Sequence, residues 1–151
     1  MAYTTQEGRT QILDDSAAAV LDLAEAVSAL GDAYETLDED SADRLEAELF
    51  KPLQSAYGLL QRTHTEFAAR VGLAAARFAA PQQTAVMETR ALIERAADAI
   101  QAADDALAEL QDTLLPVEVG DQELRTGLSA VRTTIAPLPE LCDEFVRTVG
   151  R

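Results

Sequence analysis

Apolar residues recur every three or four positions through most of this chain, which is the spacing of one face of an α-helix. The first such seam, meaning a line of positions on one helix face, runs from Leu13 through Ser16 to Leu37 in alternating steps of three and four. Comparable seams continue through the rest of the chain. The pattern predicts four helices, at about residues 5–37, 41–79, 81–114 and 121–149.

Polar residues and prolines mark where these helices begin. Thr4 and Glu7 have the spacing of a capping box, the polar run 38–41 offers an N-cap, and Asp121 is placed to cap the last helix. Pro81 suits the first turn of the third helix, since a proline there loses no hydrogen bond.

Three further prolines lie inside predicted helices. Pro52 falls in the second helix, and Pro137 and Pro139 fall in the fourth. A proline removes one backbone hydrogen bond and its ring clashes with the preceding turn, so each is expected to bend or break its helix.

The predicted connections between helices are short, and short connections make consecutive helices antiparallel neighbours. The chain of 151 residues has the length of one domain. We therefore predict an all-α fold, an up-down-up-down four-helix bundle formed by residues 1–151. A dimer of helical hairpins is the alternative.

A weak internal repeat relates the two halves of the chain. Residues 64–72 align with 142–150 at an offset of 78 and share Glu, Phe, Val and Gly, and the first helix aligns with the third at an offset of 80. The repeat predicts two hairpins related by a pseudo-twofold axis, with the second helix diagonally opposite the fourth.

Charge is distributed unevenly among these segments. The chain carries 27 acidic and 12 basic side chains, for a net charge of −15. Residues 1–40 hold 10 acidic and 1 basic side chain and residues 81–116 hold 7 and 2, whereas residues 41–80 hold 4 and 5. We expect the second helix to lie between the two acidic helices and to relieve their repulsion.

Several classes of protein do not fit this composition. A surface this acidic does not suit nucleic acid, and the sequence has no long uncharged stretch for a membrane and no signal peptide at its start. The single cysteine, Cys142, allows no internal disulfide. The expected location is the cytoplasm, and the acidic excess also suits a salty or high-GC host.

Few residues suggest chemistry. The di-iron site of helical bundles needs two Glu-x-x-His pairs, but this chain has one histidine, His64, and no cofactor is expected. His64 and Cys142 occupy equivalent repeat positions, and with the second and fourth helices parallel they would share one polar layer in the core. The pair then suggests either structural packing or, less favoured, a Cys–His enzyme oriented by Asp15 or Asp98.

Two other features suggest binding. The breaks at Pro52, Pro137 and Pro139 are candidate sites for an apolar pocket, although an inert bend is the simpler interpretation. Acidic residues also form a stripe on the first helix and another on the third. The stripes comprise Asp15, Asp22, Glu25, Asp32 and Glu35, and Glu94, Asp98, Asp105, Glu109 and Asp112.

The function that these observations favour is that of a non-enzymatic interaction or scaffolding module. Its acidic surface would bind a protein partner, a basic one in particular, or would take part in self-association. A bundle that binds a small ligand near the proline breaks is the alternative.

Overall fold

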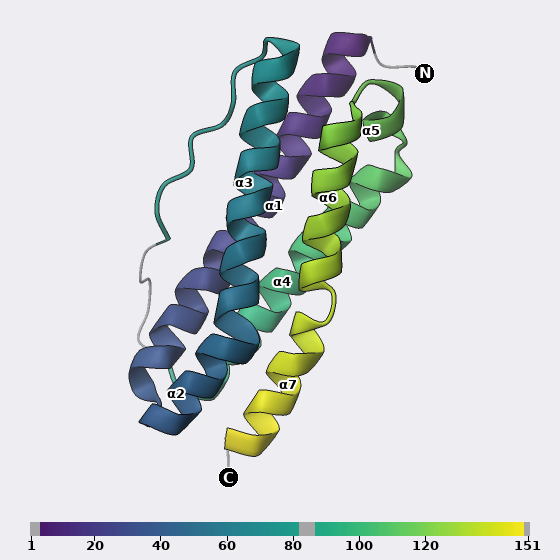
Figure 1. The fold of residues 1–151 in the computed structure, drawn as a ribbon. Coiled ribbons are helices and arrows are strands. Elements are labelled where there is room, and N and C mark those ends of the chain that lie inside the picture. The colour runs from purple at the N-terminus through teal and green to yellow at the C-terminus, as the bar shows by residue number, and fades with distance from the viewer. Residues whose placement is uncertain (1–3, 82–86, 150–151) are drawn as a thin grey trace.

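The computed structural model describes residues 4–81 and 87–149, and within these ranges every regular element is helical (Figure 1). The all-α class is therefore confirmed. The elements in chain order are α1 (Thr5–Thr36), α2 (Glu39–Leu45), the π-helical turn η1 (Glu46–Phe50), α3 (Lys51–Val71), α4 (Thr89–Asp112), α5 (Leu115–Glu118), α6 (Gln122–Ile135) and α7 (Leu138–Val149).

Three predicted N-caps are present. The Thr4 hydroxyl accepts a hydrogen bond from the Glu7 backbone N–H at 3.1 Å, and the Glu7 carboxylate accepts one from the Thr4 N–H, which completes the capping box. Asp38 caps α2 and Asp121 caps α6 by accepting backbone N–H bonds at 2.8 and 2.9 Å. These caps satisfy amide donors that the first helical turn leaves free.

The predicted second and fourth helices are each divided near their prolines. The turn η1 ends two residues before Pro52, and there the Lys51 N–H donates to the carbonyl of Glu46, five residues earlier. In the last segment, α6 ends at Ile135 and α7 begins at Leu138, between Pro137 and Pro139.

The predicted boundary between the second and third helices is wrong. Helix α3 ends at Val71 because Gly72 adopts a left-handed conformation, with φ of 71°, and the Leu73 N–H bonds back to the Ala68 carbonyl at 3.0 Å. Residues 73–81 lie outside any helix, Pro81 among them, and the next described helix, α4, starts at Thr89. Residues 82–86 of the predicted third helix lie outside the described residues.

This extended stretch changes the topology. Residues 73–81, the crossover segment, run back along the bundle from the end of α3 (Figure 1). Helices α3 and α4 consequently point in the same direction, and the up-down-up-down order is wrong. That order assumed a short turn at 79–81, whereas a long connection lets two consecutive helices lie parallel.

The neighbour relations differ accordingly. Helix α1 packs against both α3 and α4, and the α6–α7 pair packs against the other sides of α3 and α4. The second predicted helix is thus adjacent to the fourth rather than diagonal to it, and it does not separate the two acidic helices. In this arrangement a twofold axis perpendicular to the bundle would interchange the hairpin of α1 and α3 with the hairpin of α4 and α6–α7. The repeat relationship between the two hairpins stays a prediction.

Small side chains allow the two acidic helices to pack together. The buried face of α1 includes Ala19, Ala26, Ala29 and Ala33, and that of α4 includes Ala96, Ala97, Ala99 and Ala103. Alanine lets helix axes approach closely, and the backbone contact between α1 and α4 is the most extensive in the molecule's described part. Close packing therefore decides which helices become neighbours, despite the charge on both.

Candidate functional site

His64 lies in the core with both ring nitrogens hydrogen-bonded. It projects from α3 toward α1, is 1% exposed, and its Nδ1 lies 2.8 Å from the Ser16 hydroxyl. Its Nε2 accepts a hydrogen bond from the backbone N–H of Ala76, in the crossover segment, at 3.0 Å. The Phe78 ring packs edge-on against the imidazole, with ring centroids 5.2 Å apart.

These contacts fix the protonation state of His64. A backbone amide can only donate, so Nε2 must be unprotonated, and the proton of the neutral ring resides on Nδ1 and is donated to Ser16. Burial lowers the pKa of His64, against a smaller opposing effect of the Asp14 carboxylate. The ring is therefore neutral at pH 7.

The same geometry argues against Ser16 as a nucleophile activated by His64. A general base must accept the serine proton, but Nδ1 already carries a proton, and the Ser16 hydroxyl donates to the Leu13 carbonyl at 3.1 Å. Ser16 is also only 1% exposed. The contacts fit a structural network in which His64 joins α3, α1 and the crossover segment.

Cys142 does not share a layer with His64, and that prediction is wrong. Three pairs set the register of antiparallel α2–α3 and α6–α7: Arg70 with Asp121, Thr63 against Gly127, and Arg44 over the Phe145 ring. Cys142 then lies level with about residue 47, which is about 25 Å along the axis from His64 at 1.5 Å per residue. The prediction failed because it assumed parallel helices.

The Cys142 thiol is also a poor nucleophile at neutral pH. It is 1% exposed, and burial together with Asp143 raises the pKa of its thiol to about 12. The thiolate is the nucleophilic form, so almost none is present at pH 7. Nor do the proposed orienting carboxylates act on His64, because Asp14, rather than Asp15 or Asp98, exerts the electrostatic effect there.

Sequence reasoning missed the true partners of His64. Ser16 occupies a seam position that is otherwise apolar, and a hydroxyl at such a position signals a buried polar contact. Ala76 had no detectable signal, because its contribution is a backbone N–H.

The three prolines named as candidate pocket sites lie elsewhere than the four principal grooves. None of these four grooves is lined by Pro52, Pro137 or Pro139. Pro52 and Pro139 each occupy the first turn of a helix. The two larger of the four, of about 510 and 460 Å³, border α1 instead.

The acidic stripe of α1 lies along its junction with α4. We use the term acidic face for five carboxylates here: Asp15, Asp22, Glu25 and Asp32 of α1 and Glu109 of α4. Asp15 and Glu109 line one groove of about 310 Å³ from opposite sides. Asp98 and Asp105 are exposed on the outer side of α4 and extend the negative charge.

Two carboxylates of the acidic face have pKa values above the usual range of an aspartate. Burial raises the pKa of Asp15, as do Asp14 and Glu109, although a hydrogen bond from Gln11 opposes them. Burial and Glu25 likewise raise the pKa of Asp22. Within the described ranges neither aspartate forms an ion pair with an arginine or lysine.

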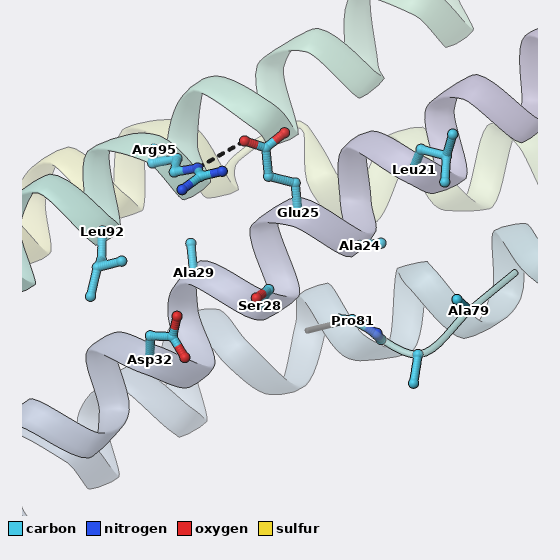
Figure 2. Close-up of a pocket in the computed structure, with 11 residues that line it drawn as sticks. Leu21, Ala24, Glu25, Ser28, Ala29, Asp32, Ala79, Pro81, Leu92 and Arg95 are labelled. Carbon is cyan, nitrogen blue, oxygen red and sulfur yellow. Dashed lines mark hydrogen bonds and ion pairs between the residues drawn. The ribbon is translucent and has the colours of Figure 1, made fainter. Parts of the chain in front are cut away.

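A second groove, of about 460 Å³, lies at the other end of this face (Figure 2). Leu21 and Ala24 of α1 and Leu92 of α4 give it an apolar surface, and the crossover segment forms one wall through residues 79–81. Arg95 and Glu25 pair across it at 2.8 Å, and Asp32 lies at its edge. Leu21 is 63% exposed, so the groove offers apolar surface beside negative charge.

The described residues contain no group of three His, Cys, Asp or Glu side chains that could hold a metal ion, and no described helix is both long and apolar enough to cross a membrane. Comparison of the chain with protein-family models, with curated proteins and with solved structures gives no match.

Proposed function

We propose that this protein is a non-enzymatic, cytoplasmic four-helix-bundle module that binds a basic protein segment on its acidic face. The observation that carries the proposal is the direct packing of α1 against α4, which gathers the two most acidic helices of the chain on one surface. A positive partner would relieve repulsion that the chain itself leaves in place at Asp15 and Asp22.

The groove beside Glu25 and Asp32 indicates what else the partner carries. Its apolar surface, including the exposed Leu21, suits an aliphatic or aromatic side chain flanked by arginine or lysine. The partner is therefore a basic amphipathic segment. A second copy of this chain is a poor occupant, because two acidic faces would repel each other.

The test compares two variants of equal net charge. The face variant carries Asp15→Asn, Asp22→Asn, Asp32→Asn and Glu109→Gln, which leaves the Glu25–Arg95 pair intact. The control variant carries Asp40→Asn, Asp43→Asn, Glu140→Gln and Glu144→Gln, at exposed positions on α2 and α7 that form no ion pair within the described residues. Both remove four negative charges, and circular dichroism verifies that both fold.

The probe is a fluorescein-labelled peptide of alternating lysine and leucine pairs, titrated in 0.1 M NaCl and followed by fluorescence polarisation. We expect the face variant to bind about tenfold more weakly than the control variant, since four charge contacts of a few tenths of a kcal/mol each are lost. Equal weakening of both variants would mean that only net charge matters, and the proposal would then fail.

A further inference from the structure

The crossover segment is fastened to the bundle at His64. Apart from the C-cap bond from the Leu73 N–H to the Ala68 carbonyl, the structure gives one hydrogen bond from residues 74–81 to the helices, from the Ala76 N–H to Nε2 of His64 at 3.0 Å. Leu73, Ala75 and Phe78 add partly buried apolar contacts to the core. Ala76 itself is exposed, so its N–H is the feature that binds.

The bond to Ala76 depends on the charge of the imidazole. Protonation places a hydrogen on Nε2, which then faces the Ala76 N–H as donor against donor, and the bond cannot persist. The hydrogen bond between Nδ1 and the Ser16 hydroxyl survives, because Nδ1 carries a proton and donates it in both the neutral and the protonated imidazole. A proton therefore acts selectively on the contact with the crossover segment.

We propose that His64 is an acid-sensitive clip, which holds the crossover segment on the bundle when neutral and releases it when protonated. The segment also forms one wall of the groove shown in Figure 2, through residues 79–81. Release would therefore alter the shape of that groove. The clip itself stands whether or not the acidic face binds a partner.

The charged groups around His64 determine the pH range. On α1 the nearby carboxylate is Asp14, the crossover segment carries only Arg77, and on α3 the neighbouring charges are the exposed Arg62 and Glu66. Helix α6 presents the uncharged Gly127 to this part of α3. Burial outweighs Asp14, so the pKa of His64 lies below 6.5 in the folded protein.

The lowered pKa of His64 determines how the stability of the folded protein changes with pH. The native state binds fewer protons than the unfolded chain, so the contribution of His64 is complete above the unfolded pKa of about 6.5. It is lost as the pH falls through that value toward the lower folded pKa. The clip thus loosens as the pH falls below about 6.5.

Hydrogen exchange measured by mass spectrometry tests the clip, with exchange times scaled for the intrinsic effect of pH. From pH 7.5 to pH 5.0, peptides covering residues 73–81 should lose several-fold to about tenfold protection, as expected for one lost hydrogen bond. Peptides from the centres of α1 and α4 should keep theirs. Unchanged protection of the crossover segment at pH 5.0 would overturn the proposal.

Three variants separate the clip from general acid effects. His64→Gln offers a carbonyl oxygen to Ala76 and does not titrate, so its crossover segment should stay protected at both pH values. Ala76→Pro removes the donor, so the remaining amides of the crossover segment should exchange fast already at pH 7.5, with no further response to acid. Ala74→Pro, a matched change at an exposed position of the same segment, should retain the response.

The tautomer gives a readout that does not depend on any substitution. At pH 7.5 the ¹⁵N shifts of His64 should show a protonated Nδ1 and an unprotonated Nε2. A proton on Nε2 at that pH, or an equal response to acid in wild type and Ala76→Pro, would contradict the clip.

Discussion

Phe67→Ala is expected to lower the free energy of unfolding by about 3–5 kcal/mol, the range typical of a buried phenylalanine replaced by alanine. Phe67 is fully buried in α3 and is the largest of the described side chains that are less than 2% exposed. Its removal leaves a cavity where α3 packs into the core, which tightly packed neighbours fill only in part. Urea denaturation at pH 7.5 measures the change.

Phe78→Ala is the matched control for that cavity. Phe78 is only partly buried and belongs to the crossover segment, so its loss should cost about 1–2 kcal/mol, in proportion to the smaller area it buries. Equal costs for the two substitutions would show that the crossover segment is as much part of the core as α3, contrary to the packing described above.

Gly127→Ala is expected to destabilise the protein by about 1–3 kcal/mol through overpacking. Gly127 lies inside α6, where alanine would ordinarily favour the helix, but a Cβ atom there would overlap the Thr63 side chain of α3. The Thr63 hydroxyl donates to the Leu59 carbonyl at 2.8 Å, so it has little freedom to move away. The glycine therefore permits close approach of α3 and α6.

Gly31→Ala provides the comparison, because a Cβ atom at residue 31 of α1 would meet nothing within 4 Å. This substitution should stabilise the protein by about 0.5–1 kcal/mol, the usual difference between the two residues inside a helix. Thermal and urea unfolding measure the change in stability, which should be a loss for Gly127→Ala and a gain for Gly31→Ala. A stabilising Gly127→Ala would show that α6 and α3 are further apart than the structure has them.

Local signals in the sequence predicted local structure well. The seam and capping box located α1 to within one residue at its C-terminal end, and the polar run 38–41 and Asp121 marked two further helix starts. These features depend on residues close in the chain, where helical spacing and capping chemistry act directly.

The extension of the second helix to residue 79 failed for a physical reason. Residues 74–76 and 79–80 are alanines, which have the highest helix propensity, and Phe78 continues the helical spacing. Gly72 nevertheless ends the helix, and the crossover segment instead uses Leu73, Ala75 and Phe78 to cover the core. Propensity was outweighed by a C-cap and by tertiary packing.

The error in that one connection propagated to the site. With the second and fourth helices taken as parallel, His64 and Cys142 fell in one layer, whereas the antiparallel register separates them. The acidic stripes were recognised on both helices, but their adjacency was not, since charge repulsion suggested separation. Neither the alanine-mediated contact of α1 with α4 nor a bond to a backbone N–H could be predicted from side-chain patterns alone.

The side-by-side, antiparallel packing of α1 and α4 underlies the acidic face, and one distance tests it. The Thr36 hydroxyl at the end of α1 bonds to the Thr89 hydroxyl at the start of α4, and the adjacent Glu35 and Arg90 are both exposed. Spin labels at Glu35→Cys and Arg90→Cys can be placed without modifying the buried, protonated Cys142.

Pulsed electron paramagnetic resonance on this doubly labelled protein should give a narrow distribution centred at about 15–25 Å, allowing for the length of the two labels attached to adjacent helix ends. An up-down-up-down bundle would place the start of α4 at the opposite end from the last turn of α1. The distance would then be about 35 Å or more, the length of a 24-residue helix, and that result would contradict the account.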